Sequence, residues 1–172
     1  MNTFTVEYLP NDLRMKAASL SEIRTTLNHL PPEVLSELCI RLIKYKKENK
    51  EFLSYLLYEA DDETGYVDGI KKEMDILFKE VNRRNLTLSK KTLQKILRQI
   101  NRYAKYSGSK RTDADLHIYF CLKLRESGLP LDKNAMLQNI YMRQLTRIRK
   151  ALATLHEDLQ YDYEEVMEKL MR

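Results

Sequence analysis

Apolar residues recur at steps of three and four along most of this chain. Residues 32–45 show the pattern, because Val34, Leu35, Leu38 and Leu42 would share one face of a helix. Strand-like alternation of apolar and polar residues does not occur between such segments. The pattern predicts an all-α fold, with helices over about 32–45, 50–60, 67–82, 89–106, 114–126, 134–155 and 160–170.

The predicted helices follow one another through short connections, which is typical of stacked antiparallel helical hairpins. We expect about seven to eight helices, arranged as a compact bundle or as a short HEAT-like superhelix. A chain of 172 residues can bury a core, so we predict a single domain over 1–172, with an irregular segment over 1–18. Residues 114–126 are apolar almost all the way round and are the expected central helix.

Capping residues predict where two of these helices begin and end. Ser89 is the expected N-cap of the helix over 89–106, and Gly108 is expected just beyond its C-terminus. Thr112 or Asp113 is expected to cap the next helix, because short polar side chains satisfy the first backbone N–H groups.

Charge is distributed unevenly along the chain. The sequence has 30 Lys and Arg against 25 Asp and Glu, a net charge of +5. Residues 83–111 alone hold ten of these cations and no acid. The rest of the chain therefore has 20 cations and 25 acids, a net charge of −5. This polarisation indicates where a polyanion or an acidic surface would dock, but it names no reaction.

The cations of the predicted helix over 89–106 fall within about 80° of one another, opposite its apolar stripe. Any amphipathic helix needs a polar face, but a polar face that only contacts solvent usually contains both acidic and basic residues. We therefore expect this basic face to bind a polyanion, above all the nucleic-acid backbone. The expected contact residues are Lys91, Lys95, Arg98, Arg102, Lys105, Tyr106, Lys110 and Arg111, with Arg143, Arg147 and Lys150 of a later helix as a candidate extension.

The acidic C-terminal segment offers a second explanation. Residues 157–170 are the most acidic part of the chain and could pair with the basic face, within one chain or between two copies. The protein would then be an adaptor or a self-associating scaffold. Its partner would be an acidic protein surface, including a second copy in a homo-oligomer.

Two other groups of residues have chemistry that a site could use. His117 and Cys121 are four apart, a spacing that two metal ligands can have, and Asp113 could add a third. A structural zinc site normally needs four ligands, so we expect neither a metal nor another cofactor. The acidic turn over 59–63 and the His156 cluster are explained by helix capping, with proton transfer as the alternative.

Sequence motifs of common enzymes are absent. The chain has no P-loop, HExxH, GxSxG, CxxC pair or dinucleotide fingerprint. We expect a binding protein, and an enzyme with a dispersed active site is the remaining alternative. The N-terminus has no apolar signal region, and no segment approaches the roughly 20 apolar residues that span a bilayer. We therefore expect a cytoplasmic protein without membrane contact.

Two resemblances accompany these patterns. Residues 32–60 resemble a HEAT unit in the spacing of their apolar residues. With its stretches over 106–110 and 155–163, the chain as a whole resembles small, uncharacterised all-helical bacterial proteins. The first resemblance implies a helical hairpin, and the second implies no activity.

Overall fold

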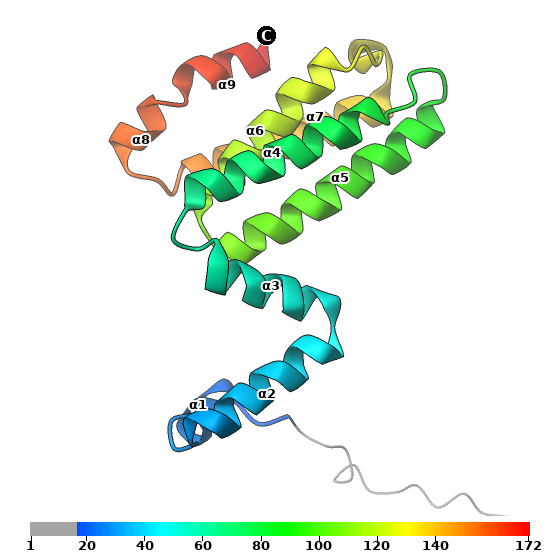
Figure 1. The fold of residues 1–172 in the computed structure, drawn as a ribbon. Coiled ribbons are helices and arrows are strands. Elements are labelled where there is room, and N and C mark those ends of the chain that lie inside the picture. The colour runs from blue at the N-terminus through cyan, green and yellow to red at the C-terminus, as the bar shows by residue number, and fades with distance from the viewer. Residues whose placement is uncertain (1–16) are drawn as a thin grey trace, which may run out of the picture. The chain divides into compact units, whose positions relative to one another are not determined.

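A computed structural model describes residues 17–172, and this part of the chain is helical without any strand (Figure 1). The predicted all-α fold is therefore confirmed. Its elements are α1 (Leu20–Leu27), α2 (Pro32–Tyr45), α3 (Lys47–Tyr58), α4 (Glu63–Lys79), α5 (Leu86–Ser107), α6 (Lys110–Glu126), the 3-10 helix η2 (Leu131–Lys133), α7 (Ala135–Leu152), α8 (Glu157–Tyr161) and α9 (Glu164–Met171).

The contacts divide the chain into two units, with the boundary inside α3 between Lys50 and Glu51. This division does not test the prediction of a single domain over 1–172, which stays a prediction. Every buried apolar side chain of the described residues belongs to the second unit, from Tyr55 to Leu170. Periodicity could not show this division, because α2 has the same apolar spacing as helices that are buried. The irregular segment expected over 1–18 falls almost wholly outside the described residues.

In the first unit, local signals place the helix ends. Ser19 and Glu22 form a capping box at the start of α1, each side chain accepting from the other residue's backbone N–H. The helix α2 has the predicted bounds and begins with Pro32, whose missing N–H costs nothing in a first turn. It ends at Lys46, where the backbone is extended.

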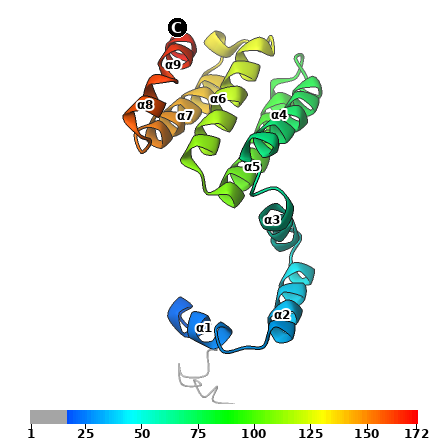
Figure 2. The same cartoon turned by 60° about the vertical axis from the view of Figure 1, so that its left-hand side comes forward.

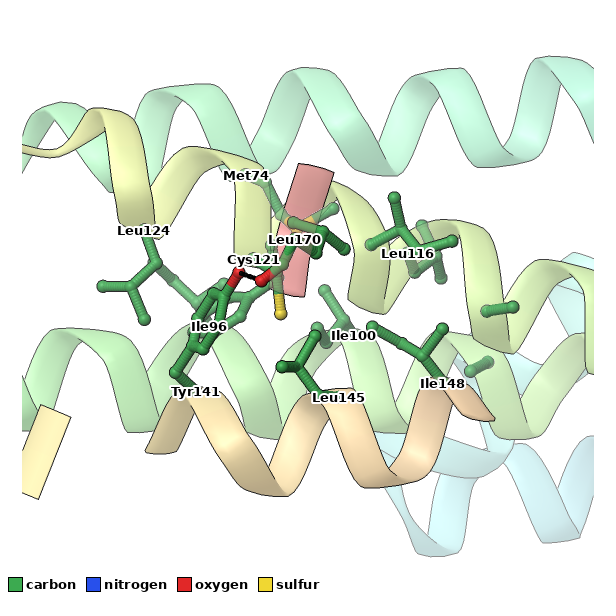
Figure 3. Packing of buried hydrophobic residues seen from close by; sticks show 14 of the residues in the cluster. Met74, Ile96, Ile100, Leu116, Cys121, Leu124, Tyr141, Leu145, Ile148 and Leu170 are labelled. Atoms are coloured by element: carbon green, nitrogen blue, oxygen red, sulfur yellow. Dashed lines mark hydrogen bonds between the residues drawn. The ribbon is translucent and has the colours of Figure 1, made fainter. Parts of the chain in front are cut away.

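The second unit is a bundle in which α4, α5, α6 and α7 run successively antiparallel (Figure 2). The helix α6 contacts α4, α5, α7 and α9, which confirms residues 114–126 as the centre of the fold. Figure 3 shows side chains of α5, α6 and α7 meeting in this core. They include Ile96, Ile100, Leu116, Leu124, Leu145 and Ile148.

Several predicted helix boundaries are wrong, and three of them concern caps or an interrupted helix. The helix α5 begins after Asn85, and Ser89 is instead buried and donates to the carbonyl oxygens of Asn82 (2.5 Å) and Asn85 (3.0 Å). The helix α6 begins at Lys110, because Ser109 caps it in place of Thr112 or Asp113. The helix predicted over 160–170 is two short helices, α8 and α9. Thr112 and Asp113 instead bond to Glu63 of α4 and Arg147 of α7, whereas Ser89 bonds to the turn that precedes α5.

Gly108 follows the last residue of α5, as predicted. Its φ of 69° lies in the left-handed region that favours glycine, and its N–H donates to the carbonyl oxygen of Ala104 at 3.0 Å. This turn reverses the chain between α5 and α6, so the C-terminal cations of α5 lie near the first turn of α6.

Candidate polyanion-binding surface

The helices α5 and α7 point in the same direction, because each packs antiparallel against α6 (Figures 1 and 2). Neither contains an acid, and together they have ten cations. The cations are Lys90, Lys91, Lys95, Arg98, Arg102 and Lys105 on α5, and Arg143, Arg147, Arg149 and Lys150 on α7.

Arg147 joins the two helices. Its Nη1 donates to Oδ1 of Asn101 on α5 at 2.5 Å. Its Nε donates to both carboxylate oxygens of Asp113 on α6, at 3.0 and 3.1 Å, and its Nη2 lies 2.8 Å from Oδ1. Arg147 is thus paired within the bundle. Its charge is not fully available to an external anion, although the sequence predicted it as a contact residue.

The Asp113 side chain is only 15% exposed. Burial by itself would raise the pKa of this carboxyl, but the imidazole of His117 at 3.5 Å and the hydrogen bonds and charge of Arg147 lower it to about 2. Asp113 is therefore ionised at neutral pH and is neutralised by Arg147. The ion pair therefore adds no net negative charge at the junction of α5, α6 and α7.

The basic face of α5 divides into two rows. Lys95 lies 3.9 Å from the carboxylate of Glu80, and Arg102 lies 3.1 Å from that of Glu51. These two cations thus lean towards acids of α3 and of the segment after α4. The charges of Lys95 and Arg102, two predicted contact residues, are therefore partly neutralised by acids of the same chain.

Tyr106 is also engaged internally. Its ring stacks on Phe52 with centroids 5.4 Å apart, and its hydroxyl donates to Glu51 at 3.2 Å. Tyr103 donates to Glu73 at 3.1 Å. Tyr106, a predicted contact residue, therefore packs against α3, and its neighbour Tyr103 bonds to α4.

The other row of α5 faces α7. Arg98 and Lys105 precede and follow Asn101 by three and four residues, so the three lie within about 60° of one another on the helix. Arg143 and Lys150 flank Arg147 in the same way. The two pairs flank the residues of the Asn101–Arg147 bond on their own helices, and we call them the α5–α7 basic surface: Arg98, Lys105, Arg143 and Lys150.

The four residues of the α5–α7 basic surface are exposed. Within residues 17–172, no carboxylate lies within 4.0 Å of any of them, in contrast to Lys95 and Arg102. Lys91 on α5 and Lys110 in the first turn of α6 are likewise exposed and without such a neighbour in the described chain. These cations are available to an external anion.

Arg111 differs from Lys110. Burial raises the pKa of Tyr163 to about 12, the hydrogen bond to Asp115 adds to the rise, and Arg111 opposes it. Arg111 therefore lies beside Tyr163, which donates to Asp115 at 2.7 Å.

Asn101 connects α5 to α7 and was not predicted from the sequence. The only sign of its role in the sequence is a polar side chain beside the apolar stripe of α5.

The candidate metal ligands do not assemble into a site. His117 is fully buried, its Nε2 is 3.5 Å from Asp113, and neither ring nitrogen has a well-aligned hydrogen-bond partner. Burial lowers the pKa of His117 and raises that of Cys121 to about 12, so the imidazole and the thiol are neutral. No three His, Cys, Asp or Glu among residues 17–172 lie together as metal ligands would.

The acidic turn has a structural role. Asp62 caps α4 by accepting from the N–H of Gly65 at 2.9 Å. Glu63 accepts from Tyr55 at 2.9 Å and also from the hydroxyls of Ser107 and Thr112. Burial would raise the pKa of Glu63, but these hydrogen bonds outweigh it and lower the pKa. This carboxylate ties together α3, α4, α5 and α6.

The His156 cluster is open to solvent. The side chains of His156 and Asp158 are 75% and 91% exposed, and the imidazole accepts from the N–H of Asp158 at 3.4 Å to cap α8. Glu165 and Glu168 of α9 pair with Lys169 (2.6 Å) and Arg172 (3.6 Å). The helix α9 packs on α6, and its acids form no ion pair with α5 among the described residues.

Comparison of the chain with family models, curated proteins and solved structures gives no match. A helix long and apolar enough to cross a bilayer does not occur in residues 17–172.

Proposed function

We propose that this protein is a non-catalytic binding module that contacts the nucleic-acid backbone through the α5–α7 basic surface. The observation behind the proposal is the Arg147–Asn101 bond, which holds two acid-free helices together. Lys91 and Lys110 extend the same cationic area. Lys and Arg side chains at such spacing neutralise phosphates and release counterions, which drives binding without reading sequence.

Duplex is the favoured form of the ligand. Single-stranded nucleic acid is usually held by exposed aromatic side chains on which bases stack. Here Tyr103 and Tyr106 donate to Glu73 and Glu51 and pack within the bundle. A basic surface without free aromatic rings supports contact with phosphates of a duplex.

Self-association is the second candidate. The acids of α9 stay exposed on the side that does not pack against α6, so a second copy could place them on the α5–α7 basic surface. Both candidates assume a cytoplasmic protein, as two free thiols indicate. The two differ in stoichiometry, because only self-association changes the mass of the protein alone.

The test is the fluorescence anisotropy of a labelled 20-base-pair duplex titrated with protein at several salt concentrations. Four phosphate contacts by the α5–α7 basic surface predict a slope of about −3.6 in log affinity against log salt, and further contacts by Lys91 and Lys110 would steepen it to about −5.4. Lys105→Glu/Lys150→Glu should weaken binding by about tenfold or more, since two contacts are lost and two repulsions gained. The matched control is Lys72→Glu/Lys79→Glu, which changes the net charge equally on exposed positions of α4.

Equal losses in the two double variants would show that net charge, and not this surface, binds the duplex. Absence of duplex binding by the unmodified protein at about 50 mM salt would also reject the proposal. Sedimentation of the protein alone then decides whether self-association replaces it.

A further inference from the structure

A cavity of about 840 Å³ lies in the second unit and shares no residue with the α5–α7 basic surface. Its walls come from the end of α6, the turn with η2, α7 and α9. Its floor is apolar and buried, formed by Leu129, Tyr141, Leu145 and Leu170, three of which are labelled in Figure 3. Small-molecule sites typically have volumes of about 300–1,000 Å³ and apolar linings of this kind.

The charge around the cavity is strongly positive. Its lining includes four cations, Arg125, Lys133, Arg149 and Arg172, and a single acid, Asp132. Arg172 pairs with Glu168. Arg125 and Arg149 have no carboxylate within 4.0 Å in the described chain, so an anionic ligand would meet unneutralised charge.

Most hydrogen-bond donors of Arg125 and Arg149 are unused. Each guanidinium has five N–H donors. Arg125 donates to the carbonyl oxygen of Lys169, and Arg149 donates to the thioether sulfur of Met171 at 2.7 Å, which is a weak acceptor. Both arginines thus reach the last turn of α9 from different helices and keep donors for a carboxylate or phosphate.

We propose that this cavity binds a small amphiphilic anion, a single acyl chain that ends in a carboxylate or a phosphate. The chain lies on the apolar floor, and the head group accepts from Arg125 and Arg149. Met142 and Met171 at the rim are 53% and 51% exposed, and their flexible side chains can close over the chain. The ligand is identified by its charge and its apolar length.

The experiment is isothermal titration of the full chain with dodecanoate, dodecyl phosphate and dodecyltrimethylammonium, each below its micelle concentration. Both anions should bind one per chain, and the cation with the same alkyl chain should bind at least about tenfold more weakly. Decanoate should bind more weakly than dodecanoate by about fourfold per missing methylene. The ratio of the affinities for dodecanoate and dodecyl phosphate shows whether the site prefers a carboxylate or a phosphate head group.

Arg149→Gln should weaken the binding of dodecanoate by about tenfold. Its matched control is Arg143→Gln, because Arg143 lies about 120° away around α7 and does not line the cavity. Arg143→Gln should weaken the binding of the duplex and leave the affinity for dodecanoate unchanged. Each proposal can therefore fail without the other. Equal binding of the cationic and anionic amphiphiles, or equal effects of the two variants on dodecanoate, would overturn this site. The ligand comparison needs no variant, so a folding defect cannot obscure it.

Discussion

Arg147 of α7 donates to Asn101 of α5 across a distance of 2.5 Å, while its other nitrogens hold Asp113 of α6. One side chain therefore connects three helices. It also removes the negative charge of Asp113 from the junction, so that the exposed cations on either side face solvent without a competing acid. The proposed binding surface depends on this internal ion pair.

The two rows of α5 should contribute unequally to duplex binding. Arg98→Glu/Arg143→Glu should weaken binding by about tenfold or more, whereas Lys95→Glu/Arg102→Glu should weaken it less, because Lys95 and Arg102 already pair with Glu80 and Glu51. Anisotropy at one fixed low salt concentration measures both. If the Lys95/Arg102 variant lost more duplex affinity, the duplex would contact that row of α5 and not the row of Arg98 and Lys105.

Removal of Arg147 should cost stability in a pH-dependent way. Arg147→Met leaves the Asp113 carboxylate, which is only 15% exposed, without its ion-pair partner, at a cost of about 1–3 kcal/mol at pH 7. The folded pKa of Asp113 is lowered to about 2, against about 3.9 in an unfolded chain. The stabilisation is thus present above about pH 4 and is lost as the pH falls towards 2.

Urea unfolding of both proteins at pH 7, 4 and 2.5 measures this difference. Arg143→Met is the control, because Arg143 is exposed on the same helix and has no ion pair in the described structure. A gap between the unmodified protein and Arg147→Met that stays constant down to pH 2.5 would contradict the role given to Asp113.

Glu63 should contribute more to the stability of the fold than an exposed acid such as Glu164. Glu63→Gln removes the charge from an acceptor that serves Tyr55, Ser107 and Thr112 and should destabilise the fold by about 1–3 kcal/mol. Glu164→Gln, at an exposed position in α9, should change stability by less than about 0.5 kcal/mol. Chemical denaturation of both variants tests the claim, which equal midpoints would refute.

The two cysteines should react at very different rates with a thiol-specific reagent. Cys39 is exposed, whereas Cys121 is fully buried and burial raises the pKa of its thiol to about 12. We expect one fast thiol per native chain and two after denaturation in guanidinium. Cys39→Ser should abolish the fast phase; a fast phase that survives would mean that α6 opens readily.

The sequence by itself determined the helical class, the bounds of α2 and the concentration of cations between residues 83 and 111. These features are local: the period of apolar residues, the preference of Pro32 for a first turn, and the composition of one segment. A helix presents an apolar stripe whatever packs against it. Such features therefore survive without knowledge of the partners.

Only the tertiary structure decided which cations face outwards and which are held by internal acids. Arg102 and Arg147 look like any other basic positions in the sequence, yet Glu51 and Asp113 engage them from 51 and 34 residues away. The same long-range contact to Arg147 occupied Asp113, which local patterns had assigned to a helix cap. Side chains on one helix face are equivalent along the chain, and they become different only when neighbouring helices bring specific partners within hydrogen-bond distance.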